Sequence, residues 1–125
     1  MILGLGTDLV ATSRLEAILA RHGDRFLRRV FTPVEQAECL DRARPAPHLA
    51  ARLAAKEAAM KALGTGWGEG VHWQNIEVHS TGRRPPLLTL HGAARQEAER
   101  QGIRHTLVSL SHDGDYAIAV VIATD

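Results

Sequence analysis

The sequence has a single cysteine, few aromatic residues and almost no net charge. One cysteine among 125 residues excludes an internal disulfide and agrees with a reducing compartment, so we expect a cytoplasmic protein. No apolar run is long enough to span a bilayer, and the N-terminus lacks an export signal, so we expect no membrane partner. A formal net charge of +1 and 4% aromatic residues give no support to nucleic-acid binding.

The seven histidines also lack the spacing of a structural zinc site, because there is no His-x-x-x-His and no Cys/His pair. The length leaves room for one domain, residues 1–125, with one modest core.

The most informative segment is an alanine-rich helix. From Leu49 to Leu63 every residue is Ala, Leu or Met except four charged ones, and Gly64 supplies a C-terminal stop. A helix that is apolar almost all round is usually buried, and an unpaired buried charge is costly. The four charges must therefore share a crevice with each other, with a metal or with a charged ligand. They are Arg52, Lys56, Glu57 and Lys61.

Two interpretations of these charges stay open. One is a solvated helix surface with a single Glu57–Lys61 pair, four residues apart. The other is a cationic cleft that contains one acid, which suits a polyphosphate and a hard cation. The glycine-rich stretch from Gly64 to Gly70 follows this helix, whereas phosphate cradles precede one, so we expect a turning loop there.

The first segment, Ile2–Val10, alternates like a strand. One face carries Leu3, Leu5, Thr7 and Leu9, and the other carries Gly4, Gly6 and Asp8. Glycines weaken a strand, so their common face indicates that something approaches the backbone closely there. Asp8 lies on this face, and we favour a ligand role for it over a turn cap.

A helix is predicted to follow, with a capping box of Ser13 and Glu16. Its core stripe is Leu15, Ile18, Leu19, His22 and Phe26. A second stripe is a column of arginines, because their separations nearly complete whole turns. This column is either a dock for an acidic surface or a solvated face. Its members are Arg14, Arg21, Arg25 and Arg28.

The remaining patterns predict alternating short elements. Together they indicate an α+β fold, an antiparallel sheet packed on a long Ala-rich central helix. The expected elements are a helix from the Thr32–Glu35 capping box to about Arg42, with Pro45 and Pro47 separating it from the central helix, strands at Asn75–Ser80 and Pro86–Leu90, a helix over Ala93–Gln101, and a hairpin of Thr106–Ser111 and Tyr116–Ala123 with an Asp113-Gly114 turn.

Four of these motifs together resemble holo-acyl-carrier-protein synthase, the half-length class of 4'-phosphopantetheinyl transferases. The resemblance covers nearly the whole chain. The motifs are Gly4-Leu-Gly6-Thr-Asp8-Leu-Val10, Phe31-Thr32-Pro33-x-Glu35, Ala54-Ala-Lys56-Glu57-Ala-Ala-x-Lys61-Ala-Leu-Gly64-Thr-Gly66, and Val108-Ser-Leu-Ser-His112 with Tyr116-Ala117.

The resemblance implies transfer of the phosphopantetheine arm of coenzyme A to a serine of acyl carrier protein, as in fatty acid biosynthesis. It implies Mg2+ held by Asp8 and Glu57, and a catalytic Lys61 that stabilises phosphate charge. The base for the serine is either Glu57 or a metal-bound water. Expected coenzyme A contacts are Arg52, Lys56, Lys61 and Gly64.

The resemblance also implies partners. Acyl carrier proteins are acidic, so the arginine column would dock one, and the family typically forms trimers, so we expect a homotrimer. The alternative is a non-catalytic coenzyme A or nucleotide-binding module. Such a module would keep Arg52 and Lys56 but would not need Asp8 together with Glu57.

Overall fold

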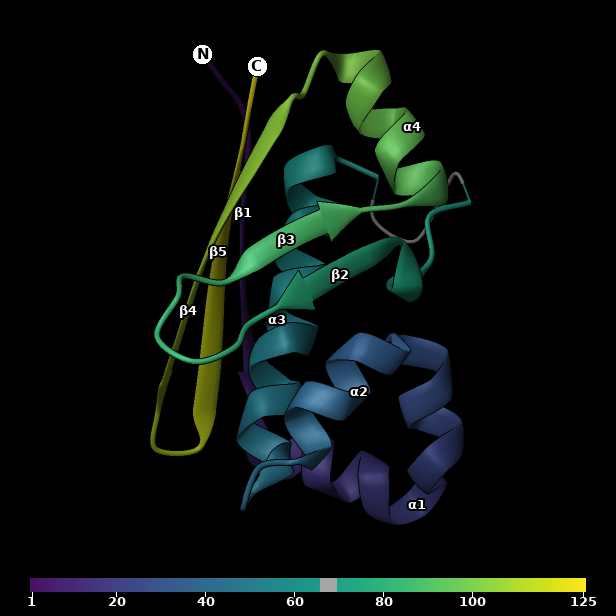
Figure 1. Cartoon of the computed structure of the whole chain (residues 1–125), viewed down its shortest axis with the longest axis vertical. Coiled ribbons are helices and arrows are strands. Elements are labelled where there is room, and N and C mark those ends of the chain that lie inside the picture. Colours follow the sequence, from purple (N-terminus) through teal and green to yellow (C-terminus); the bar gives the residue numbers. More distant parts are fainter. Residues whose placement is uncertain (66–69) are drawn as a thin grey trace.

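The computed structural model describes residues 1–65 and 70–125, and one central helix, α3, organises it (Figure 1). The described strands form two antiparallel sheets, of order β1-β5-β4 and β2-β3. The α+β class and the packing of strands on the alanine-rich helix are confirmed. The elements are β1 (Ile2–Ala11), α1 (Thr12–Val30), α2 (Pro33–Leu40), α3 (Pro45–Leu63), a 3-10 turn η1 (Trp73–Asn75), β2 (Ile76–His79), β3 (Leu87–Leu90), α4 (Gly92–Gln101), β4 (His105–Asp113) and β5 (Tyr116–Thr124).

Helix α3 begins earlier than predicted. Pro45 and Pro47 do not separate it from α2 but lie in its first turn, where a missing N–H loses no intrahelical partner. The stop at Gly64 is confirmed, with φ of 74° and its N–H donating to the Lys61 carbonyl at 3.1 Å. Within residues 1–65 and 70–125, no helix combines the length and apolarity needed to cross a membrane.

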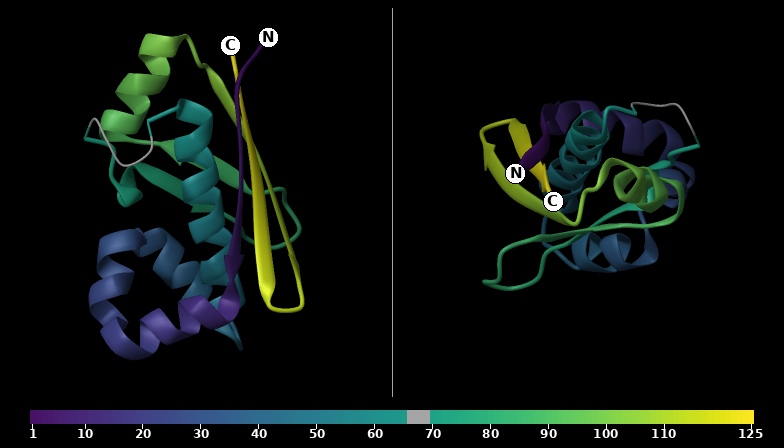
Figure 2. Two further views of the ribbon diagram at one scale, coloured as in Figure 1. Left: turned by 180° about the vertical axis from the view of Figure 1, so that it is seen from behind. Right: turned by 90° about the horizontal axis from the view of Figure 1, so that it is seen from above.

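The three-stranded sheet covers one side of α3, and α1, α2 and β2 lie against its other sides (Figure 2). The close approach predicted from the glycines is confirmed, because α3 lies directly on β1. A Cβ added at Gly6 would be 1.8 Å from the Ala58 carbonyl oxygen, and one at Gly4 would be 2.1 Å from that of Ala62. These two glycines therefore let the helix backbone touch the strand backbone.

Helix α1 differs from its prediction. Its N-cap is Ala11, and Ser13 forms no capping box; instead the Ser13 hydroxyl donates to Asp115 Oδ2 at 2.6 Å. Gly23 has non-helical angles, φ 49° and ψ −126°, which kink the helix. The predicted core stripe holds for Leu15, which is fully buried, but His22 is exposed.

The capping box at the start of α2 is confirmed. The Thr32 N–H donates to Glu35 Oε1 at 2.9 Å, and the Glu35 N–H donates to Thr32 Oγ1 at 3.2 Å. The helix ends at Leu40 rather than near Arg42.

The later elements follow the predicted order. Strands β2 and β3 pair antiparallel, and α4 ends at Gly102, which has φ of 80°. The last hairpin is confirmed, but its turn is Gly114-Asp115, because Asp113 pairs with Tyr116.

The contact between α3 and β1 predicts a large effect of one methyl group. We expect Gly6→Ala to lower the free energy of unfolding by about 3 kcal/mol or more, because the added Cβ meets a backbone carbonyl that cannot move aside. Guanidinium unfolding measures this. Thr7→Ala, on the exposed face of the same strand, is the control. Equal unfolding free energies for the two variants would contradict the contact.

Candidate functional site

Asp8 and Lys61 meet at the edge of the contact between β1 and α3. Asp8 follows the two glycines on the inner face of β1 and pairs in register with Ala119 of β5. Lys61 lies in the last turn of α3 and is 57% exposed, and its Nζ is 3.1 Å from Asp8 Oδ1. The same ammonium donates to the Thr7 carbonyl at 2.9 Å. The lysine thus neutralises one side of the Asp8 carboxylate.

Glu57 also lies close to Asp8. Partial burial, then a hydrogen bond to Asp8 and the Asp8 charge, raise the pKa of the Glu57 carboxyl from 4.5 to about 7. Arg14 and Lys61 act in the opposite direction on that pKa. The structure therefore brings the acid of the first strand and the acid of the alanine-rich helix together.

The second carboxylate oxygen of Asp8 lacks a partner in the part of the chain that the structure describes. This atom, Oδ2, is buried and accepts no hydrogen bond from the described residues. Two ionised carboxylates only accept hydrogen bonds, so either a proton or a cation must lie between them. In the described ranges, no group of three His, Cys, Asp or Glu residues forms a closed metal centre. Two carboxylates fit Mg2+, which keeps several water or phosphate ligands.

Lys56 lies in the protein interior rather than on an exposed face of α3. Its side chain is fully buried, and its Nζ lies 2.8 Å from Glu35 Oε1. It also donates to the Trp73 carbonyl at 3.1 Å and to the Ile76 carbonyl. A buried cation needs acceptors inside the protein, and here they come from α2, η1 and β2. This burial gives no support to the predicted contact of Lys56 with coenzyme A, which stays untested.

Arg52 is also nearly buried, although its Nε has no hydrogen-bond partner among the described residues, and its predicted contact with coenzyme A stays a prediction. Its side chain is 4% exposed, it lies 3.6 Å from Glu38 Oε1, and it donates to the His48 and Ser80 carbonyls at 3.2 Å each. Sequence reasoning read Glu35 only as a helix cap and did not use Glu38. Their three-residue spacing, on one face of a helix, was the available signal.

Gly64 lies at the exposed C-terminal end of α3. Its predicted contact with coenzyme A stays a prediction. The greater part of the glycine-rich stretch, residues 66–69, lies outside the described residues.

The arginines do not form one column, because the kink at Gly23 separates them into two groups. Arg14, in the first turn of α1, is close enough to Glu57 to lower its pKa. Beyond the kink, Arg25 lines a surface hollow with His22, Phe26 and Arg29. All four predicted arginines, Arg14, Arg21, Arg25 and Arg28, are exposed.

Sequence reasoning also missed a basic hollow where α3 begins. It is lined by Arg42, Arg44, His48 and His112 among others. Burial, followed by the charges of Arg42 and Arg52, lowers the pKa of His48.

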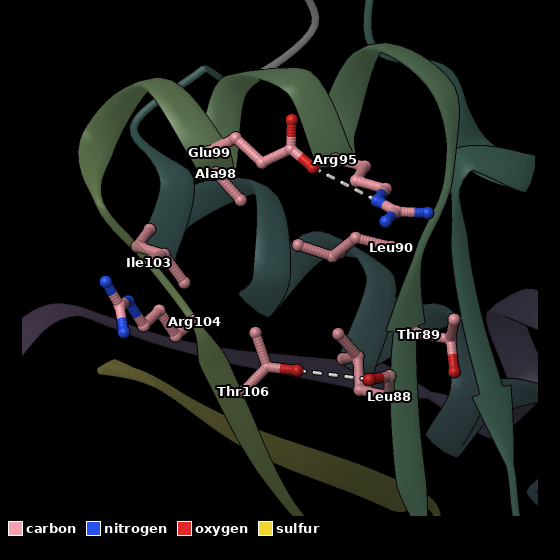
Figure 3. Close-up of a pocket in the computed structure, with 9 residues that line it drawn as sticks. All are labelled: Leu88, Thr89, Leu90, Arg95, Ala98, Glu99, Ile103, Arg104 and Thr106. Carbon is pink, nitrogen blue, oxygen red and sulfur yellow. Dashed lines mark hydrogen bonds and ion pairs between the residues drawn. The ribbon is translucent and has the colours of Figure 1, made fainter. Parts of the chain in front are cut away.

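A different hollow lies between α4, β3 and β4 (Figure 3). Its lining is part apolar and part polar, and on α4 the Arg95 Nε donates a hydrogen bond to Glu99 at 3.2 Å. Asp8, Glu57 and Lys61 do not line it. This hollow is therefore separate from the carboxylates and the lysine at the β1–α3 edge.

Comparison with known proteins decides the family. A profile of the 4'-phosphopantetheinyl transferase superfamily matches residues 4–121. The chain is 43% identical over 122 residues to the holo-[acyl-carrier-protein] synthase of Solibacter usitatus, covering 98% of each. It is 50% identical over 124 residues to that of Alkalilimnicola ehrlichii, covering 98% of this chain and 96% of the relative. The chain belongs to the holo-acyl-carrier-protein synthase family.

Solved structures of family members have the same fold. The synthase of Neisseria meningitidis matches with a TM-score of 0.91 and 35% identity, over 100% of both chains. The synthase of Helicobacter pylori, solved in complex with coenzyme A, matches with a TM-score of 0.83 and 32% identity, over 96% of this chain and 99% of the other.

The raised pKa of Glu57 predicts how stability depends on pH when divalent cations are chelated. Between pH 4.5 and about 7 the unfolded chain loses the Glu57 proton while the folded chain keeps it. We therefore expect the stability of the wild type, relative to Glu57→Gln, to fall across this range and to level off above it. Thermal melts of both proteins in chelator, at several pH values, measure the difference. A difference that stays constant with pH would contradict the raised pKa.

Proposed function

We propose that this chain, a holo-acyl-carrier-protein synthase by family, transfers the 4'-phosphopantetheine arm of coenzyme A to a serine of an acyl carrier protein, releasing adenosine 3',5'-bisphosphate. The proposed cofactor is Mg2+, with Asp8 and Glu57 as its protein ligands. The observation that carries the proposal is the convergence of these two carboxylates, with one buried Asp8 oxygen that has no partner among the described residues and an exposed lysine beside Asp8.

The residues of the site have separate roles in breaking a pyrophosphate bond. When bound, the cation neutralises charge on the phosphate oxygens. The exposed ammonium of Lys61 is free to turn from Asp8 toward the phosphate and to stabilise charge on the leaving group. With the cation bound, its positive charge would keep the Glu57 carboxyl ionised, and this carboxylate is then able to accept the proton of the attacking serine. Rigid placement of these groups on a strand and a buried helix supplies the orientation that the transfer needs.

The exposed arginines on the two parts of α1 are the proposed docking surface for the carrier protein. Arg14 is close enough to Glu57 for its charge to lower the Glu57 pKa, so a carrier bound to this face would bring its serine toward the site. Arg21 is exposed on the same straight part of the helix, before the kink. Arg25 and Arg28 extend the basic surface beyond the kink in another direction. A basic surface of this kind complements an acidic partner.

Self-association is supported by the outer face of the three-stranded sheet. The inner face is covered by α3, but the outer face carries exposed apolar side chains at opposed positions. Leu5 and Leu107 both pair in register with Ile122 and are 65% and 60% exposed, and Leu9 pairs with Ile118. Apolar patches of this kind mark interaction surfaces. We propose a homotrimer assembled through this face, with a cytoplasmic location.

Intact mass spectrometry tests the activity. With Mg2+, coenzyme A and an apo acyl carrier protein, we expect the carrier to gain the mass of a phosphopantetheine arm, and chelator to prevent the gain. Asp8→Asn should lower kcat/KM at least ~100-fold, the scale for removing one preorganised charge. Binding of coenzyme A without any mass gain would instead favour the non-catalytic binding module.

A variant of Arg21 distinguishes docking of the carrier protein from binding of coenzyme A. Arg21→Glu should raise the KM for the carrier about tenfold, since about 1.4 kcal/mol of attraction is lost, and leave the KM for coenzyme A unchanged. Equal losses for both substrates would contradict docking on α1.

The proposed trimer predicts that one substitution on the outer face lowers the molar mass of the protein in solution. Leu5→Asp places a charge in the apolar row of the outer face, and we expect it to convert a trimer into a monomer in light scattering. Gln96→Asp, an exposed change on α4, is the control and should stay trimeric. A wild type that is monomeric at micromolar concentration would refute the assembly.

A further inference from the structure

The hydrophobic pattern of α3 does not determine how the helix is rotated about its own axis. Its residues are Ala, Leu or Met on nearly every side, and nearly every side is buried. An amphipathic helix is oriented by its apolar stripe, but a helix without a polar side gains little from one rotation over another. Some other interaction must select the rotation that turns Glu57 toward Asp8.

The glycine contact sets a distance rather than a rotation. Gly4 and Gly6 allow the β1 backbone to touch α3 at Ala58 and Ala62. On one side of that contact line the next positions are Ala55 and Ala59, so a helix rotated in that direction would present similar small groups to the glycines. On the opposite side of α3, by contrast, the contacts are specific and polar.

Arg52 with Glu38 makes one of these contacts, but the fully buried one is made by the Lys56 ammonium. Its three protons have three acceptors from three separate segments: Glu35 of α2, the Trp73 carbonyl and the Ile76 carbonyl. Its Nζ also lies 5.8 Å from the centre of the Phe31 ring.

Both carboxylate oxygens of Glu35 also have partners. Its Oε1 accepts from the Thr32 N–H at 2.9 Å as well as pairing with Lys56, and its Oε2 accepts from the Val78 N–H at 2.8 Å. The pair therefore joins α2, α3 and β2 through fixed directions. A rotation of α3 would break several buried hydrogen bonds at once, which is costly.

We propose that the buried Glu35–Lys56 pair fixes the rotation of α3 and so positions Glu57 and Lys61 on Asp8. Glu35 and Lys56 are positioning residues, and neither contacts substrate. The inference rests on the proposed function, because it takes Asp8 and Glu57 as the cation ligands.

The size of the effect follows from helix geometry. A helix with its side chains is about 10–12 Å across, so a rotation of ~20° moves a surface group by roughly 2 Å. Mg2+ and Mn2+ sites hold their oxygens within tight distances, about 2 Å from the metal for Mg2+. A displacement of this size therefore separates Glu57 from a cation that Asp8 still holds.

The test uses Glu35→Gln and Lys56→Met in the full chain, at a temperature where circular dichroism shows each to be folded. Two quantities are measured: the Kd for Mn2+ without coenzyme A, by electron paramagnetic resonance, and the steady-state kinetics. We expect the Kd for Mn2+ to rise at least ~10-fold and kcat to fall at least ~30-fold, within the range for residues that orient metal ligands. The KM for coenzyme A should change less than about threefold, because neither side chain touches it.

Ile103→Ala is the control for stability alone. Ile103 is buried under α4, outside the pair and its partners, and its truncation lowers the melting temperature through a cavity. We expect it to retain wild-type affinity for Mn2+ and wild-type kcat. Loss of Mn2+ affinity in this control would show that any destabilisation weakens the site, and would overturn the proposal.

The double variant Glu35→Gln/Lys56→Met decides the case if a single variant fails to fold. It removes both charges, so no uncompensated buried ion remains. We expect the double variant to fold and to show the same raised Kd for Mn2+ as the single variants. Folded variants with wild-type Kd and kcat would overturn the proposal. A wild type that binds no Mn2+ and transfers no phosphopantetheine would instead refute the proposed function.

Discussion

The contact of α3 with β1 is the constraint on which the site depends. Strand and helix backbones come this close only because Gly4 and Gly6 lack side chains at the contact. Asp8 follows the second glycine on the same face, so the contact carries its carboxylate to the helix surface. There it meets Glu57, whose pKa is raised to about 7 by burial and by Asp8. The glycines thus act on the chemistry of the site without taking part in it.

The site was largely predictable where the pattern was local. The glycine face of the first strand required a close neighbour, and the alanine-rich helix required burial of its four charges; both requirements are visible in a few consecutive residues. The Thr32 capping box was equally local, because its two partners are three residues apart. The joining of Asp8 to Glu57 needed more, since no periodicity relates the two segments, and there the family resemblance supplied the connection.

The parts that could not be predicted depend on residues distant in sequence. The pattern required an acceptor for Lys56 but could not distinguish an acid of α2 from a bound phosphate, because both satisfy a buried cation. Likewise Ser13 bonds to Asp115, 102 residues away, instead of capping its own helix. The kink at Gly23 is a third case, because an isolated glycine inside a helical pattern is often tolerated without a bend. In each case, tertiary contacts selected one of several arrangements that the local sequence allowed.

The two faces of β1 connect the site to the proposed assembly. Alternation along the strand places Asp8 on the face toward α3 and Leu9 on the exposed apolar face. One chain offers two carboxylates and a lysine that is 57% exposed, which is a shallow surface for a ligand as long as coenzyme A. Burying the apolar face against a second copy would leave Asp8 turned inward and would place new walls near the site. The sheet that supports the carboxylates would then also be the element that encloses their substrate.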